Sequence, residues 1–203
     1  MRDVRYVTCL PSDTYYTWQV HLWVESLRLI GKSDKAIVLI YMPKARAHNT
    51  KWDQILALYP ETKFIFMRER DHEDINSLIG LYIPIIREYL MLRFTTELPE
   101  EAKHAIFFCD SDILFTEDFN IDAYLDDDIN YLSDAVSYMG ATYIENKYLE
   151  VLPEKLEEYK SKDVLQEILD CVGVTRETAT LNQSVSGGAQ YLLKNTSPEF
   201  WAK

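Results

Sequence analysis

The strongest constraint on the fold is an almost continuous apolar run at residues 35–41, Lys-Ala-Ile-Val-Leu-Ile-Tyr, which stops shortly before Pro43. A strand with one face in water alternates apolar and polar side chains, whereas an unbroken apolar run is typical of a strand buried on both faces. Such strands occur in parallel sheets, whose crossover connections are usually helices that cover the sheet. The run therefore predicts a parallel sheet between two layers of helices.

Other strand-like and helix-like segments alternate with this run through the first half of the chain. Short β-rich or apolar stretches predict three more strands, at residues 4–10, 63–67 and 105–109. Apolar residues at helical spacing predict three helices: one capped by Ser12 or Asp13 and ended by Gly31, one from Thr50 to Tyr59, and one from Asn76 to Phe94 that Pro84 interrupts. This order predicts an α/β fold with a mostly parallel sheet and helices on both faces.

The second half of the chain has a different character. Residues 130–144 are rich in tyrosine and β-like, a helix is expected between Pro153 and Gly173, and a Gly-Gly pair precedes a strand near residues 189–193. These features predict a small mixed sheet within one domain of residues 1–203. The chain stops at residues 197–203 in what looks like the start of a helix, so we expect a fragment of a longer protein.

Charge is distributed unevenly along the chain. The net charge is −12, and residues 97–170 alone hold 5 basic and 20 acidic side chains, a balance of −15. No basic stripe is present, which argues against binding to nucleic acid through its phosphates. The acidic part either attracts cations or forms a solvated face. No apolar run reaches the roughly 18 residues of a membrane span, and the charged amino terminus leads straight into a strand, so we expect a cytoplasmic protein without a signal peptide.

The three cysteines and four histidines do not form a recognisable metal or disulfide pattern. Cys9, Cys109 and Cys171 are far apart and lack the CxxC spacing of zinc sites. Cys9 and Cys109 lie in apolar strand-like runs, so we expect them to be core residues rather than nucleophiles.

The clearest chemical signal is Asp110-Ser111-Asp112, which directly follows the fourth predicted strand. In extended backbone the two aspartates would point to the same side, and their charges would repel unless a cation lay between them. Mg²⁺ and Mn²⁺ prefer oxygen ligands and often bind a substrate phosphate as well. Ligands of open α/β sheets bind at the carboxyl ends of the strands, where this motif lies. The alternative is that one aspartate caps a turn and the other is simply exposed.

With this motif the chain resembles the GT-A superfamily of nucleotide-sugar-dependent glycosyltransferases. In that superfamily a DxD motif after the fourth strand holds the divalent metal that bridges the donor diphosphate. The stretch Ser-Gly-Gly-Ala-Gln-Tyr at residues 186–191 looks like the glycine-bearing strand that lines the sugar pocket of related enzymes, including hydroxyproline O-arabinosyltransferase-like proteins. The resemblance implies a Rossmann-like GT-A fold, with a nucleotide-binding half at 1–112 and a sugar and acceptor half at 113–203.

The resemblance also implies roles for individual residues. Asp112 would coordinate Mn²⁺ or Mg²⁺ directly, and Asp110 would contact the metal or the ribose. The other residues expected at the donor, most plausibly a UDP-sugar, are Thr8, Leu10 and Pro11 at the nucleotide, Arg87 at the phosphates, Ser111 within the motif, and Gly187, Gly188 and Gln190 at the sugar. Gln190 and Asp134 are the candidates for the catalytic group, with Glu145 as a further acidic candidate. Tyr15 or Trp18 could stack on a base or sugar, although aromatic residues at helical spacing are usually core.

Two alternatives stay open at this stage. Many members of the superfamily supply a third metal ligand, often a histidine, after the sugar-pocket strand, and this chain has no histidine after His104. A catalytically degenerate domain that only binds a nucleotide sugar would account for this. A phosphatase or phosphotransferase of the haloacid-dehalogenase type also uses a DxD motif. That family places the motif after the first strand and continues with Thr or Val, whereas Ile113 follows here.

Overall fold

The computed structural model describes residues 3–44, 49–75, 85–118, 121, 129–132, 163–181, 190–193 and 197–201. The chain forms two compact units, one of Met1–Tyr131 with Gln190–Lys203 and one of Leu132–Ala189. Within the described ranges, no helix is both long and apolar enough to cross a membrane.

In chain order the elements are β1 (Val4–Pro11), α1 (Tyr15–Leu29), η1 (Ser33–Lys35), β2 (Ala36–Met42), α2 (Lys51–Leu58), β3 (Lys63–Arg68), α4 (Ile85–Glu97), α5 (Pro99–Ala102), β4 (Ala105–Phe108), β5 (Ile129–Leu132), α8 (Val164–Val172), α9 (Arg176–Leu181), β6 (Gln190–Leu193) and α10 (Pro198–Trp201).

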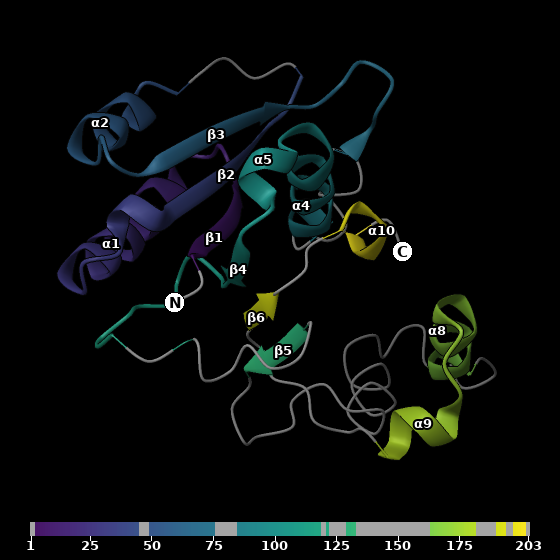
Figure 1. The fold of residues 1–203 in the computed structure, drawn as a ribbon. Helices are drawn as coiled ribbons and strands as arrows, with labels where there is room; N and C mark the ends of the chain where they lie inside the picture. The colour runs from purple at the N-terminus through teal and green to yellow at the C-terminus, as the bar shows by residue number, and fades with distance from the viewer. Residues whose placement is uncertain are drawn as a thin grey trace, which may run out of the picture. The chain divides into compact units, whose positions relative to one another are not determined.

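The strands form a sheet in the order β3-β2-β1-β4-β6-β5 (Figure 1). β1 is parallel to β2 and to β4, and β2 is parallel to β3, so four adjacent strands run the same way. The predicted α/β fold is confirmed at this level. β6 runs antiparallel to β4, and both β6 and β5 extend the same sheet. Among the described residues, the strands of the second half thus extend the main sheet, and residues 133–144 of the predicted small sheet lie outside the described residues.

Helices α1 and α4 cover opposite faces of the sheet. Phe108 and Cys109 are consecutive residues at the end of β4, so their side chains point to opposite faces. The indole N–H of Trp23, in α1, donates to the Cys109 sulfur at 3.2 Å. The guanidinium of Arg87, in α4, lies over the Phe108 ring, 5.8 Å from its centroid. The prediction of helices on both faces is confirmed by these contacts.

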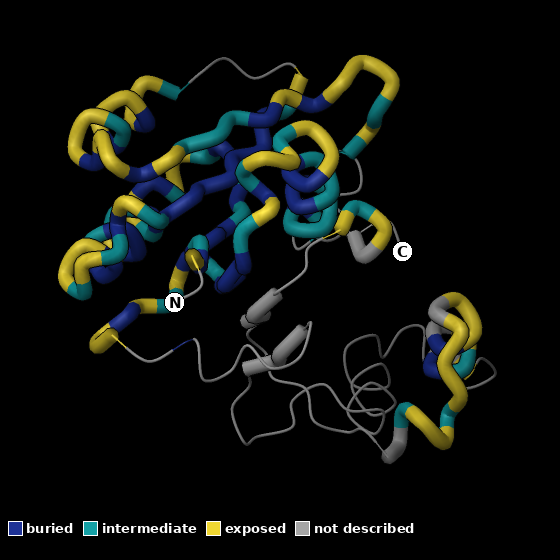
Figure 2. Tube along the Cα trace, viewed as in Figure 1, coloured by how far each residue is buried: buried dark blue, intermediate teal, exposed yellow. Residues whose placement is uncertain are grey.

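Burial is concentrated in the central strands. Every residue of β2 is buried, as the apolar run at residues 35–41 predicted. Figure 2 shows this burial continuing into β1 and β4 and onto the inner sides of the helices. The largest fully buried side chains include Trp23, Trp52, Tyr41, Phe94 and Phe108. The sheet thus gains most of its stability from apolar burial on both of its faces.

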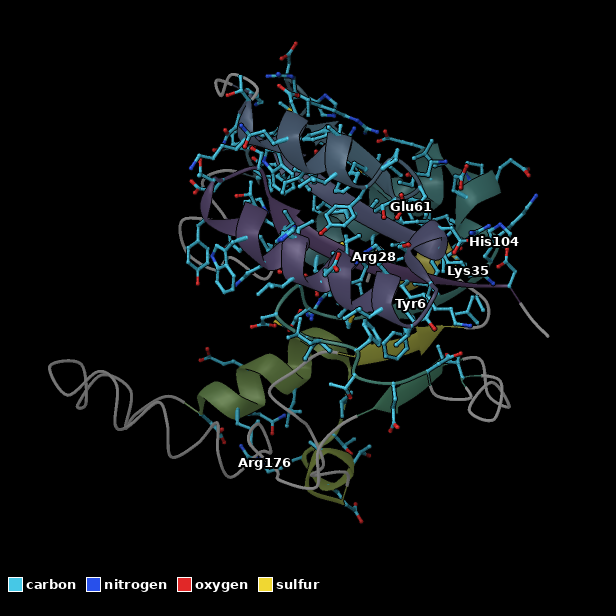
Figure 3. All side chains as sticks on the ribbon, turned by 90° about the vertical axis from the view of Figure 1, so that its left-hand side faces the viewer. Tyr6, Arg28, Lys35, Glu61, His104 and Arg176 are labelled. Carbon is cyan, nitrogen blue, oxygen red and sulfur yellow. The ribbon has the colours of Figure 1, made fainter. Side chains whose placement is uncertain are left out.

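Charged residues meet where the parallel strands begin. The Asp3 carboxylate lies 2.9 Å from Arg5, 3.2 Å from Lys35 and 3.4 Å from the imidazole of His104. Lys35 precedes β2 and His104 precedes β4, and Figure 3 shows both at one end of the sheet. Burial opposes ionisation of Asp3, but the hydrogen bond from Lys35 and the charge of Arg5 lower its pKa below the ordinary value. This ion cluster occupies the amino end of the sheet, opposite the end where Asp110 emerges.

The boundaries of α1 follow the predicted signals. The Asp13 carboxylate accepts a hydrogen bond from the Tyr15 N–H at 3.0 Å, which satisfies one of the free donors at the helix start. Gly31, with φ +72°, follows the helix, and the Lys32 N–H donates to the carbonyl of Leu27 at 2.8 Å. Helices often end with a residue in the left-handed conformation, which allows the next N–H to bond to a carbonyl of the last helical turn.

The starts of the next two helices differ from the predictions. The side chain of Thr50 makes no capping bond, and the Asn49 side chain instead accepts a bond from the Lys51 N–H at 3.1 Å. Thr50, which we expected to cap this helix, is the N-cap residue, but its side chain does not make the capping bond. α4 begins at Ile85, one residue after Pro84, and residues 76–84 of the predicted helix lie outside the described residues. The effect of Pro84 on this segment therefore stays a prediction.

The difference between core and surface leucines predicts a difference in stability. Leu39 in β2 is 0% exposed, whereas Leu29 at the end of α1 is 74% exposed. Leu39→Ala should lower the free energy of unfolding by about 2–5 kcal/mol, because it leaves a cavity in the core. Leu29→Ala, the same change at the surface, should alter it by no more than about 0.5 kcal/mol. Urea denaturation measures both, and equal losses would contradict the placement of β2 in the centre of the sheet.

Candidate functional site

The direction of the strand order reverses between β1 and β4. From β1 the chain builds β2 and β3 on one side, and it then returns to the other side of β1 to build β4. Ligands of open α/β sheets bind at the carboxyl ends of the strands at such a reversal, because the connecting segments diverge there and leave a crevice. β1 ends at this place with Pro11, and β4 leads there into Asp110. The topology thus brings two of the predicted donor-binding segments together.

The carboxyl end of β1 extends past the end of β4. The pairing of β1 with β2 continues to Pro11 opposite Tyr41, whereas its pairing with β4 ends with Val7 opposite Phe108. One more bond, from the Cys109 N–H to the carbonyl of Val7 at 3.1 Å, closes this ladder. The last four residues of β1, residues 8–11, therefore run alongside the segment that leaves β4.

The residues predicted to face a nucleotide from β1 differ in exposure. Pro11 is half-buried at the end of the strand. Thr8 is 0% and Leu10 is 1% exposed, so both side chains belong to the core. A ligand at this edge would meet the backbone at these two positions and not their side chains.

Asp110, Ser111 and Asp112 form a turn, which we call the acid turn. β4 ends at Phe108, and the Ile113 N–H donates to the carbonyl of Asp110 at 3.2 Å. The expectation of extended backbone through the motif is therefore wrong, because the chain has already left the sheet before the first aspartate. Asp112 is exposed, Asp110 is half-buried and Ser111 is buried.

Helix α1 holds the segment that contains the acid turn. Three residues on one face of α1, spaced four and three apart, bond to residues 109–115, and we call them the α1 anchor: Gln19, Trp23 and Ser26. The bonds run from the Ser111 hydroxyl to Gln19 Oε1 (2.8 Å), from Trp23 Nε1 to Cys109 Sγ (3.2 Å) and from the Phe115 N–H to Ser26 Oγ (3.1 Å). Sequence reasoning missed Gln19 and Ser26, since polar residues on a helix give no sign of partners about 90 positions away.

Arg87 places a positive charge beside the end of β4, as expected. Its guanidinium lies over the ring of Phe108 and bonds to Glu88 at 2.6 Å, and its side chain is 21% exposed. The charges of Arg87 and Asp110 act in opposite directions on the pKa of the Cys9 thiol. Arg87 thus lies beside the end of β4, paired with Glu88, and its role toward a ligand stays a prediction.

The cysteines near the site are not activated nucleophiles. Burial raises the pKa of the Cys9 thiol well above its ordinary value. Burial also raises the pKa of Cys109 to about 12, although the hydrogen bond from Trp23 works against the rise. Both thiols therefore stay protonated near neutral pH, and a reactive thiol would require the opposite shift. The prediction that they are packing residues agrees with these environments.

Tyr15 and Trp18 lie at the start of α1 and are not core residues. Tyr15 is 57% and Trp18 is 50% exposed, and their rings make an edge-to-face contact with centroids 5.8 Å apart. The interpretation of these two side chains as core is therefore wrong. They lie within one turn of Gln19, so they flank the helix face that holds the acid turn.

The donor atoms of the acid turn fit a hard divalent cation whose coordination a ligand completes. Asp110 and Asp112 supply two carboxylates. Among the described residues, no group of three or more His, Cys, Asp or Glu side chains could hold a metal ion. Mg²⁺ is usually held by one or two carboxylates together with substrate phosphates and water. The two carboxylates match that mode of binding and not a closed protein cage.

The strand that follows the predicted sugar-pocket motif lies beside β4. β6 pairs with β4 so that Tyr191 is opposite Phe108, and Gln190 begins the strand at the end from which the acid turn emerges. Gly187, Gly188 and Asp134 lie outside the described residues. Neither models of known protein families nor curated proteins match this chain. The proposal below therefore depends on the strand order, the acid turn and the residues around them.

The thiol environments lead to a direct test of the strand-end packing. At pH 8 the thiol reagent DTNB should modify one of the three cysteines quickly, namely Cys171, which is exposed. Buried Cys109 should react only when the protein unfolds, and half-buried Cys9 should react slowly, because the raised pKa values of both keep the unreactive thiol form. Cys171→Ser should remove the fast reaction. A fast reaction that survives this substitution would show that the core near the acid turn is open.

Proposed function

We propose that this chain is a metal-dependent glycosyltransferase of the GT-A type, which transfers a sugar from a nucleotide-diphosphate sugar to an acceptor hydroxyl. One observation carries the proposal: the acid turn follows β4 at the point where the strand order reverses, next to the carboxyl end of β1. In α/β proteins this is the place where a nucleotide is bound. Two adjacent carboxylates would repel the diphosphate of the donor, so they require a cation between them and the substrate.

The reaction needs negative charge to be stabilised on the leaving diphosphate. The acceptor oxygen forms a bond to the anomeric carbon, the bond from that carbon to the diphosphate oxygen breaks, and the acceptor proton passes to a base. When bound, Mn²⁺ or Mg²⁺ supplies a Lewis acid for the departing diphosphate. Asp110 and Asp112 would hold that ion, and Arg87 would add a second positive charge from the α4 face. Gln190 and Asp134 remain the candidates on the acceptor side.

The placement of β6 supports the GT-A type in particular. In the proposed enzyme the Gly187-Gly188 pair lets the backbone approach the sugar closely, which a Cβ atom would hinder. β6 begins with Gln190 at the strand end from which the acid turn emerges. A donor whose diphosphate lies at the acid turn would then extend its sugar toward the start of β6. We propose a UDP-sugar as that donor.

Ligand-dependent thermal stability tests the proposal. Mn²⁺ with UDP at about 100 times the dissociation constant should raise Tm by about 5–10 °C, because selective binding to the folded state adds about 2.7 kcal/mol in a domain of this size. Asp112→Asn should abolish the rise by removing a ligand of the cation. Asp118→Asn makes the same change of charge in the same segment, at an exposed residue that pairs with Lys32 at 3.3 Å, and it should keep the rise.

Turnover separates the possible outcomes. Release of sugar from one member of a UDP-sugar panel, dependent on Mn²⁺ and on Asp112, supports the transferase. Binding of UDP and Mn²⁺ without release would indicate a domain that only binds nucleotide sugars. Turnover of p-nitrophenyl phosphate that requires Asp110 would indicate phosphoryl transfer instead. A rise in Tm that persists in Asp112→Asn would remove the acid turn from the site.

A further inference from the structure

We infer that Gln19 is a positioning residue for the acid turn, and that it sets the affinity for the cation through its hydrogen bond with Ser111. The inference rests on the proposed function, because it is that proposal which places a cation at the acid turn. Ser111 is the residue between the two carboxylates, and its side chain is buried. Its hydroxyl donates to Gln19 Oε1 at 2.8 Å, across 92 positions of sequence.

The geometry makes Ser111 the point at which the turn is held. The bond from the Ile113 N–H to the Asp110 carbonyl closes the turn, but it fixes only the backbone within it. The bond from Ser111 to Gln19 fixes the turn relative to α1, and α1 packs against the sheet through the buried Trp23. The turn that carries Asp110 and Asp112 is therefore restricted in its movement, because the residue between them is attached to a helix.

Electrostatics explains why such an attachment matters. Without a cation, the carboxylates of Asp110 and Asp112 repel each other, and this repulsion favours turn conformations in which they move apart. A site that is already ordered binds more tightly than one that must be ordered on binding. Gln19 lowers the free energy needed to order the site, because it holds Ser111 in place before the cation binds. Loss of the bond should therefore weaken cation binding, although the charge of the site stays the same.

The chain offers a matched control in Ser26. Its hydroxyl accepts a bond from the Phe115 N–H at 3.1 Å, on the same face of α1 and in the same segment as the Gln19 bond. Phe115, however, lies beyond Ile113, where the turn closes. Loss of this bond should lower the overall stability without changing the direction of the two carboxylates. The two substitutions therefore separate a local effect on the turn from a general effect on the fold.

The experiment measures the affinity for Mn²⁺ alone and for Mn²⁺ with UDP, by the electron paramagnetic resonance signal of the free ion, at a temperature where every variant is folded. Gln19→Leu should weaken the binding of Mn²⁺ about 10-fold, which corresponds to about 1.4 kcal/mol. Gln19→Glu keeps an acceptor for the Ser111 hydroxyl and should not weaken binding. Ser111→Ala should match Gln19→Leu, and the double variant should be no weaker than either single variant.

The controls decide between the inference and the proposed function. Ser26→Ala should lower Tm and leave the affinity for Mn²⁺ unchanged. Binding by Gln19→Leu that equals the unmodified chain, or an equal loss in Ser26→Ala, overturns the role of Gln19 but leaves the proposed function standing. Equal affinity for Mn²⁺ in the unmodified chain and in Asp112→Asn overturns both.

Discussion

β1 is paired along both edges, and the two pairings have different lengths. On one edge the ladder with β2 continues to Pro11, and on the other the ladder with β4 stops at Val7. The chain after Phe108 is thereby released from the sheet while β1 continues beside it. This difference places the acid turn next to an extended edge of β1, at the reversal of the strand order. The candidate site exists because the sheet ends unevenly there.

Residues of two helices contact the segment that carries the acid turn. α1 holds residues 109–115 on one face of the sheet through the α1 anchor, and α4 places Arg87 on the other face. The residue between Asp110 and Asp112 is thus attached to α1, and Phe108, two residues before Asp110, is covered by α4. A cation bound between the two carboxylates would offset the repulsion between their charges. The proposed metal-dependent activity would depend on this arrangement.

The sequence was sufficient to predict the parts of the fold that depend on local pattern. Burial on both faces of β2 followed from its unbroken apolar run, and the end of α1 followed from Gly31. The acid turn was expected at a strand end, but its turned backbone was not, because the point where β4 separates from β1 depends on pairing between distant strands. The bond between Ser111 and Gln19 left no periodic signal either, since its partners meet only after the whole sheet has formed.

The most direct test of the account is the position of a bound cation in the chain. Paramagnetic Mn²⁺ broadens the amide signals of nearby residues, so ¹H–¹⁵N spectra recorded with a small amount of Mn²⁺ and UDP would map the site. The account predicts selective loss of the amide signals of Cys9, Leu10, Ser12, residues 109–113 and Gln190, with little change at the Asp3 cluster. Loss concentrated in other acidic parts of the chain, such as residues 163–170, would contradict it.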